Sequence, residues 1–251
     1  MILEYHRPKT IKQALQLLNR ATPDTKALAG GTVLNQPTSE AIAVVDLQAL
    51  GLDTLERRGN IWRLGAMVRL QILLETVDLT DQLKNVIHHE APLNLRQAAT
   101  IAGTVAAGDG RSPLLAALLA MDVGLEIQHA KEGLTRHDLG DWLPFRCTRR
   151  GELITAVELP INVRLAYQYV ARTPADLPII GVVVVQWPSG RTRVSLCGWG
   201  TIPLLALDGP EVGGVEEAAT SAASGSGDNW ASSEYRQAMA AVLAQRALSL
   251  V

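Results

Sequence analysis

The stretch of sequence that decides the fold is Ala29-Gly30-Gly31-Thr32-Val33-Leu34, and about seventy residues later comes Ala99-Thr100-Ile101-Ala102-Gly103-Thr104-Val105-Ala106. We expect both stretches to be turns that follow ordered segments. Glycine has no Cβ and tolerates a positive φ, so the amides of such a turn can converge on an anion such as a pyrophosphate. One glycine pair predicts only a turn. Two together predict a pair of loops that hold a dinucleotide.

Composition limits the classes of protein that fit this chain. Its 251 residues are 47% hydrophobic with a net charge of −2, which predicts a folded core in one large or two modest domains. There is no basic footprint for nucleic acid, and no apolar run of roughly 18 residues that would span a bilayer. The first residues lack the order of a signal peptide, so we expect a cytoplasmic protein without a membrane partner.

Cysteine content excludes two kinds of metal site. The chain has two cysteines, Cys147 and Cys197, and no CxxC motif. An iron–sulfur cluster or a four-cysteine zinc site therefore cannot be built from this chain alone.

The N-terminal pattern predicts a small α/β subdomain. Thr10 and Gln13 have the spacing of a capping box before a helix at 11–18, whose apolar positions form one stripe. A strand at 26–29 leads into the first glycine stretch, and a second strand follows at 41–47.

The remaining pattern predicts mixed sheets with peripheral helices, an α+β fold. Ser112 and Pro113 suit the first positions of a helix. A flexible loop or link is expected at 223–228, before a last helix whose apolar face carries Met239, Val242, Leu243 and Ala247. The middle unit is expected to have a hairpin turn at 57–60, strands at 61–66, 125–128 and 152–159, and helices at 70–74, 81–89 and 113–121. The C-terminal part is expected to have antiparallel strands at 165–170, 179–186 and 193–197.

Several other clusters favour a structural reading. Adjacent histidines on a helix point in different directions, so His88 and His89 indicate a solvated face or a helix end rather than a metal site. His137-Asp138 with Asp141 indicates a surface turn, because no nucleophile lies nearby in the sequence. Arginines 146, 149 and 150 around Cys147 indicate a solvated loop. Neither a Rossmann fingerprint nor a P-loop is present.

The two glycine stretches carry a family resemblance. Residues 29–34 resemble the AGGTDLL signature of the flavin-binding medium subunits of the xanthine dehydrogenase and carbon monoxide dehydrogenase family. Residues 96–104, RQAATIAGT, resemble that family's second motif, RNxATIGGN. Further matches follow in the same order along the chain, at 64–66, 116–122, 151–154, 159–160, 232–236 and 246–248.

This resemblance implies a fold of the vanillyl-alcohol-oxidase type with FAD as the cofactor. It implies an FAD-binding domain over 1–160, made of a small subdomain at 1–57 and a larger one at 58–160, and a C-terminal α/β domain over 161–251. The two glycine stretches would hold the FAD pyrophosphate with Asp109 nearby, and Ile154 would lie by the isoalloxazine. The residues implied to contact the cofactor are Ala29, Gly30, Gly31, Thr32, Val33, Leu34, Thr100, Ile101, Ala102, Gly103, Thr104, Asp109 and Ile154.

The resemblance also implies a role in electron transfer. Such a subunit receives electrons from the iron–sulfur clusters of a partner, while a molybdopterin subunit oxidises the substrate. The electrons then pass to NAD, a quinone or another acceptor. Because the cofactor carries the redox chemistry, no catalytic acid–base pair is expected in this chain.

The sequence departs from the family pattern at several positions. Ala102 replaces a glycine and Thr104 an asparagine, and the Ala102 methyl would crowd the phosphates if its φ were positive. Val33, Pro113 and Tyr169 also differ from the residues usual in the family. Two alternatives therefore stand beside the relay: a flavin-less structural or assembly relative, and a stand-alone flavin oxidoreductase.

Overall fold

The computed structural model describes residues 1–36, 40–76 and 79–251, which form two compact units. Unit 1 comprises Met1–Glu75, Leu93–Ala107 and Gly124–Leu159, and unit 2 comprises Thr76–Pro92, Gly108–Val123 and Pro160–Val251. One border coincides with the boundary predicted near residue 160. Two earlier segments nevertheless join unit 2, because their helices pack on its sheet. The family-based domain boundaries stay a prediction.

A three-stranded parallel sheet lies at the start of unit 1, with the order β1-β3-β2. Helix α1 (Ile11–Leu18) is capped by the Thr10 hydroxyl, as predicted, and its buried leucines pack against Val45 and Leu153. The sequence did not predict β1, because Ile2, Leu3 and Tyr5 are all exposed and show no buried alternation. The strands are β1 (Ile2–His6), β2 (Thr25–Leu28) and β3 (Ile42–Asp46).

A five-stranded sheet forms the rest of the framework of unit 1, with the order β4-β5-β8-β6-β7. The predicted hairpin is confirmed as the antiparallel pair β4 and β5. The surface turn predicted at 137–141 is wrong, because His137 and Asp138 end strand β7 and Asp141 lies in helix α7. The strands are β4 (Leu55–Arg58), β5 (Ile61–Gly65), β6 (Gly124–His129), β7 (Gly133–Asp138) and β8 (Glu152–Pro160). The helices of unit 1 are η1 (Gln48–Leu50), α2 (Leu70–Leu74), α4 (Leu93–Arg96), α5 (Ile101–Ala107), α7 (Leu139–Trp142) and η2 (Leu143–Phe145).

One buried carboxylate ties three strands of this sheet together. The Arg63 guanidinium on β5 donates to Glu126 Oε2 on β6 at 2.6 and 3.1 Å, and Arg136 on β7 donates to Oε1 at 3.3 Å. Glu126 is 3% exposed. The hydrogen bonds from Arg63 lower the pKa of Glu126, despite the opposing effect of burial.

We expect Glu126→Gln to lower the free energy of unfolding by about 2 kcal/mol at pH 7, because a charge-assisted pair is lost while the side-chain shape is kept. A carboxyl whose pKa is depressed in the folded state stabilises above its unfolded pKa of about 4.3 and loses that contribution as the pH falls. The deficit should therefore shrink in acid. Urea unfolding at pH 7 and in steps from about pH 5 down to about pH 2 measures it. Glu132→Gln, at an exposed position of the β6–β7 hairpin, is the matched control. A deficit that does not change with pH would contradict this account.

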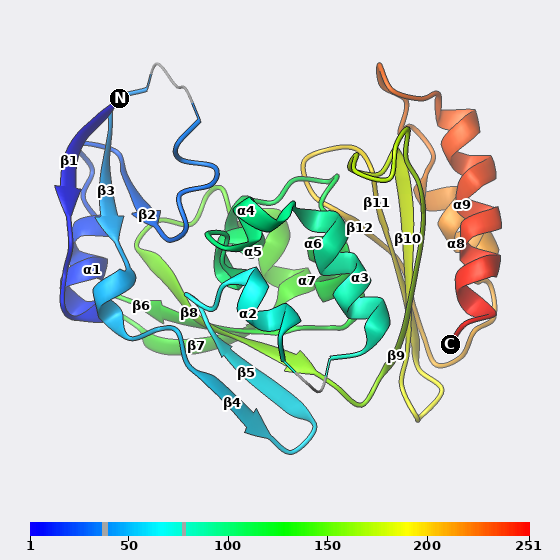
Figure 1. Ribbon diagram of the computed structural model, residues 1–251, viewed down its shortest axis with the longest axis horizontal. Helices are drawn as coiled ribbons and strands as arrows, with labels where there is room; N and C mark the ends of the chain where they lie inside the picture. Colours follow the sequence, from blue (N-terminus) through cyan, green and yellow to red (C-terminus); the bar gives the residue numbers. More distant parts are fainter. Residues whose placement is uncertain (37–39, 77–78) are drawn as a thin grey trace. The chain divides into compact units, whose positions relative to one another are not determined.

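Unit 2 is an antiparallel sheet covered by helices on both faces. In Figure 1, α8 (Val215–Ala222) and α9 (Ser233–Leu248) lie on one face, and α3 (Asp81–Glu90) and α6 (Pro113–Ala120) lie on the other. Every residue of α6 is buried, and Val182–Val185 of the central strand β10 are inaccessible from either face. The sheet has the order β12-β11-β10-β9, with β9 (Arg164–Val170), β10 (Ile180–Gln186), β11 (Thr192–Cys197) and β12 (Leu204–Gly209).

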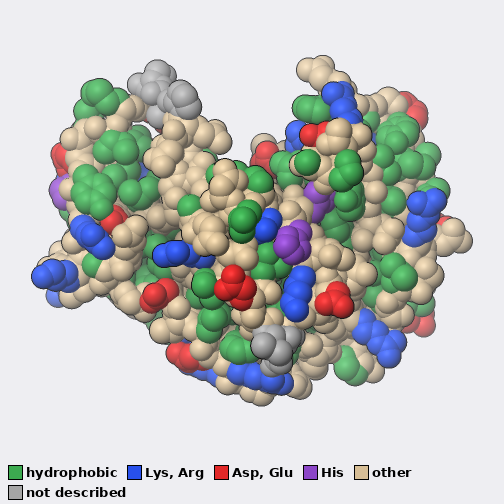
Figure 2. Space-filling model, viewed as in Figure 1, with side chains coloured by type: hydrophobic (Ala, Val, Ile, Leu, Met, Phe, Trp, Pro, Cys, Tyr) green, Lys and Arg blue, Asp and Glu red, His purple; other side chains and the backbone are tan. Residues whose placement is uncertain are grey.

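Several predictions for unit 2 are confirmed. The three predicted C-terminal strands are antiparallel, and Ser112 caps α6. Ser232 caps α9, a role that was not predicted. Strand β12 and helix α8 were not predicted, because their exposed residues blur the apolar period. Among the described residues, no helix combines the length and the apolar content that a bilayer crossing requires. Lys and Arg are interspersed with Asp and Glu over the face in Figure 2, which agrees with the small net charge.

Candidate functional site

The first glycine stretch is a turn, as predicted. Strand β2 ends at Leu28, and Gly31 has a φ of +70°, a conformation that side chains with a Cβ rarely adopt. The Asn35 amide donates to the Gly31 carbonyl at 3.0 Å and closes the turn. Gly30, Gly31, Thr32 and Leu34 are half-buried, whereas Val33 is exposed.

The second stretch is a helix rather than the turn predicted from its glycine. Ile101–Ala107 is α5, and Gly103 lies within it. The Thr100 hydroxyl accepts from the Gly103 amide at 3.1 Å, and the Thr104 hydroxyl donates to the Thr100 carbonyl at 3.2 Å. Threonine at the helix start offers this cap, which the sequence reading overlooked. Because Ala102 is helical, with no positive φ, the crowding expected from its methyl group does not arise.

Unit 1 brings the two stretches into direct contact. A Cβ placed on Gly30 would lie 1.9 Å from the Ala98 carbonyl oxygen, 2.6 Å from its carbon and 3.1 Å from Ala99 Cα. The Gly30 backbone therefore packs against residues 98 and 99, at the start of the second stretch. A glycine is required here for close approach of two main chains, not for a positive φ. Ala98 and Ala99 complete this contact, and neither was among the residues implied to contact the cofactor.

The amides of the two stretches differ in what they can bind. Within residues 1–36, 40–76 and 79–251, the amides of Gly30, Gly31 and Thr32 donate to no protein acceptor. The amides of Gly103 and Thr104 are held inside α5 by Thr100, so they are not the free donors that the sequence predicted. The free donors therefore come mainly from the first stretch.

A connecting segment locks the second stretch to the sheet. The Leu70 amide donates to Ala99 O and the Ile101 amide to Val68 O, both at 2.9 Å. The Ala66 amide donates to Thr155 O at 3.0 Å, which ties the segment to β8. Ile154, the neighbour of Thr155, is buried and pairs with Ile127 across the sheet. Asp109 belongs to unit 2, so it is not among the residues that unit 1 brings together.

Arg96, a buried arginine just before the second stretch, was not among the predicted site residues. Arg96, which ends α4, is 8% exposed, and its Nε donates to Gln71 Oε1 at 3.1 Å. Charged residues are seldom buried without partners. The signal for Arg96 in the sequence is an arginine two positions before the run of small residues Ala98-Ala99-Thr100.

For several histidines and arginines the sequence predicted no catalytic or metal-binding role. His88 is exposed, but His89 is half-buried: its Nε2 donates to the Asp176 carbonyl and its Nδ1 accepts from the Tyr167 hydroxyl, both at 2.7 Å. Burial lowers the pKa of His89. The loop predicted to be solvated is anchored, because Arg146 donates to Val105 O and Arg149 pairs with Glu152. Among described residues, no three His, Cys, Asp or Glu side chains are grouped to hold a metal ion.

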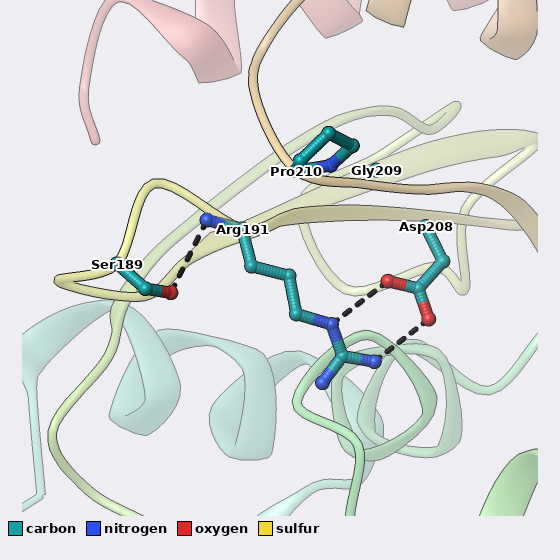
Figure 3. A pocket seen from close by; sticks show the side chains of 5 residues that line it. All are labelled: Ser189, Arg191, Asp208, Gly209 and Pro210. Carbon is teal, nitrogen blue, oxygen red and sulfur yellow. Dashed lines mark hydrogen bonds and ion pairs between the residues drawn. The ribbon is translucent and has the colours of Figure 1, made fainter.

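A surface hollow of about 410 Å³ in unit 2 is not the candidate site. It is lined by Ser189, Arg191, Asp208, Gly209 and Pro210 (Figure 3). Arg191 donates to both Asp208 oxygens, at 2.9 and 2.7 Å, and pairs with Asp122 at 2.9 Å. Its guanidinium is already neutralised within the protein. The candidate site is the turn of residues 29–32, in which Gly30 packs against Ala98 and Ala99.

The comparisons with known proteins identify the family to which this chain belongs. Residues 1–162 match the family described as the FAD binding domain in molybdopterin dehydrogenase. The carbon monoxide dehydrogenase medium chain of Afipia carboxidovorans is 27% identical over 275 residues, covering 98% of this chain and 95% of that one. An uncharacterized Escherichia coli K12 protein, YgfM, is 31% identical over 202 residues, covering 79% and 75%.

A solved structure shows the same fold. Reconstituted CO dehydrogenase from Oligotropha carboxidovorans matches with a TM-score of 0.83 and 26% identity, covering 98% of this chain and 96% of that chain. The α+β fold that the resemblance implied is confirmed. The protein belongs to the family of FAD-binding domains of molybdopterin dehydrogenases, as an oxidoreductase subunit whose cofactor is FAD.

Proposed function

We propose that this chain is the electron-transfer subunit of a molybdopterin-dependent dehydrogenase and passes electrons between partner iron–sulfur clusters and an acceptor such as NAD or a quinone. The observation that carries this proposal is the turn at 30–32, whose amides are unbonded within the described residues and whose Gly30 packs against the Ala98–Ala99 backbone. Relatives described as a medium chain and as a dehydrogenase complex subunit support a multi-subunit setting.

The residues present fit the pyrophosphate of FAD. Gly30, Gly31 and Thr32 offer amides that no protein group uses in the described parts of the chain, and the close approach of Gly30 to the Ala98 backbone holds this turn beside the second stretch. Converging backbone amides form a concavity suited to an anion. We assign the pyrophosphate to these residues together with Thr100, with Ala29, Val33 and Leu34 flanking them. Ile101, Ala102, Gly103 and Thr104 act as the helix that fixes Thr100. Ile154 at the isoalloxazine and Asp109 at the cofactor stay proposals from the family resemblance.

In this proposal the redox chemistry belongs to FAD and to partner clusters, and this chain binds and positions the flavin. When bound, FAD supplies the redox centre, while the protein supplies position and electrostatics. The chain's two cysteines are one exposed and one fully buried thiol, and they are too few for a four-thiolate cluster. Any iron–sulfur cluster that exchanges electrons with this subunit would therefore be held by another polypeptide.

The Thr32 hydroxyl is a testable part of the site. We expect Thr32→Val to weaken FAD binding about three- to tenfold, because one hydrogen bond of 0.5–1.5 kcal/mol is lost while the side-chain shape and the amides stay. Titration of FAD into the apoprotein, followed by flavin fluorescence, measures the change. Thr220→Val, on α8 of unit 2, is the control. Equal affinity for the two variants would remove Thr32 from the site.

The relay itself needs the assembled enzyme. We expect the complex with iron–sulfur and molybdopterin subunits to reduce NAD or a quinone analogue with its organic substrate, and the same complex reconstituted without this chain to fail. Bleaching of the iron–sulfur absorbance by substrate should persist in both, since it does not require this chain. Turnover of an organic substrate by the isolated chain would instead support a stand-alone flavin oxidoreductase.

A further inference from the structure

Three loops of unit 2 place two arginines on one tryptophan. Arg111 precedes α6, Arg172 follows β9 and Trp230 precedes α9. The Cζ atoms of Arg111 and Arg172 lie 4.5 and 4.4 Å from the centre of the Trp230 ring. The two guanidinium centres are therefore no more than about 9 Å apart. Trp230 is 44% exposed and Arg172 is exposed, so the cluster is open to solvent.

The loops are held in place by hydrogen bonds within unit 2. Asp228 Oδ1 accepts from the Trp230 amide at 2.7 Å, and Arg236 Nη2 donates to Asp228 Oδ1 at 3.0 Å and to Oδ2 at 2.9 Å. Arg236 is fully buried. Arg111 Nη2 donates to Leu177 O at 3.2 Å, which fastens the loop that carries Arg172. The geometry of the cluster is thus built into unit 2.

The charges of the two arginines are not neutralised by the described residues. Neither Arg111 nor Arg172 forms an ion pair in that part of the chain, and Arg111 Nε is buried without a hydrogen-bond partner there. The carboxylates of the same loops are used elsewhere: Asp109 accepts from the Arg111 amide, Asp176 from the Thr173 amide, and Asp228 from Arg236. Arg191 and Arg193 offer a contrast, because Asp122 and Asp208 pair with them.

Two like charges at this distance repel each other, and an anion between them relieves the repulsion. Guanidinium groups form paired hydrogen bonds with phosphate oxygens, and their planar fork suits that geometry better than an ammonium group does. We propose that Arg111, Arg172 and Trp230 form a binding site for a phosphate group. The group is either free phosphate or the phosphate of a nucleotide. Guanidiniums contact the indole ring, so the recognition is of charge rather than of a stacked base.

Calorimetric titration of the full chain at low ionic strength tests the site, with inorganic phosphate, ADP and NAD as separate probes. The protein is saturated with FAD beforehand, so the turn at 30–32 is filled. We expect Arg172→Ala and Arg111→Ala each to weaken binding at least tenfold, and Arg172→Lys to weaken it less. Arg164→Ala is the matched control, because Arg164 is an exposed arginine of β9 in the same unit. It should bind as the unsubstituted chain does.

The probes distinguish the sources of the phosphate. Equal affinity for phosphate and ADP indicates a free phosphate site, and tighter binding of ADP or NAD indicates a nucleotide. Binding that is equal in all four variants, or undetectable in the unsubstituted chain, overturns the proposal. Arg172 is exposed, so its variants should fold, and thermal unfolding checks this. The same titrations on protein without FAD keep the result independent of the proposed function.

Discussion

The Gly30→Ala variant should fail to bind FAD and should lose about 3 kcal/mol of unfolding free energy, near the upper end of the usual cost of overpacking. The added methyl carbon would lie 1.9 Å from the Ala98 oxygen, well inside van der Waals contact, and its neighbour is backbone rather than a flexible side chain. The two main chains must separate to admit it. Separation moves the amides of Gly30, Gly31 and Thr32 away from Thr100.

Two glycine controls separate backbone strain from loss of the site. Gly59 has a φ of +62° and open space around its Cβ position, so Gly59→Ala pays only the left-handed penalty of about 1–2 kcal/mol and should keep full FAD affinity. Gly31 has a φ of +70° and a Cβ position 3.1 Å from Asn35 Nδ2. The losses of unfolding free energy and of FAD affinity in Gly31→Ala should therefore lie between those of Gly59→Ala and Gly30→Ala. Thermal unfolding with and without FAD, together with flavin absorbance after gel filtration, measures both quantities. Full flavin retention by Gly30→Ala would contradict the assigned site.

The Arg236→Met variant should lose about 3–5 kcal/mol of unfolding free energy, because two carbonyls and the partly exposed Asp228 carboxylate lose the charged donor that a fully buried guanidinium supplies. Arg236 is inaccessible to solvent and donates to Ser226 O, to Ile179 O at 2.9 Å and to Asp228. Methionine fills much of the volume but leaves both carbonyls and the carboxylate without their donor. The Arg236 guanidinium also lies over the Trp199 ring, with Cζ 5.5 Å from the ring centre, and this contact is lost as well.

Urea unfolding followed by tryptophan fluorescence measures this loss. Arg246→Met is the matched control, because Arg246 is an exposed arginine on the same helix, and it should change the unfolding free energy by less than about 0.5 kcal/mol. A double variant with Asp228→Asn should lose less than the sum of the two single changes, because the pair is then removed together. Similar stability of Arg236→Met and Arg246→Met would show that the buried hydrogen bonds contribute little.

Local signals in the sequence predicted much of the framework. The Thr10 and Ser112 caps, the apolar period of α1 and the β-branched run of β10 each depend on residues close in the chain. Such patterns reflect hydrogen bonding and burial within one element. Elements with exposed apolar residues, such as β1 and β12, lack that regularity and were missed.

The candidate site could be predicted only in part. Gly31 needs its positive φ, and a sequence shows that need as a glycine in a turn. Gly30 instead needs room for the Ala98 carbonyl, and Gly103 sits in a helix started by Thr100. Both roles look the same in a sequence, since each is simply a glycine in a run of small residues.

The sequence alone determined the family motifs, the capped helices, the buried strands and the lack of enough cysteines for a cluster, because each depends on residue type or short-range spacing. Only the tertiary structure decided that Gly30 meets Ala98, that segments 76–92 and 108–123 join the C-terminal sheet, and that Arg111, Arg172 and Trp230 converge. Those contacts join residues about sixty or more positions apart. Their partners are selected by the packing of the whole unit, which no local pattern of side chains specifies.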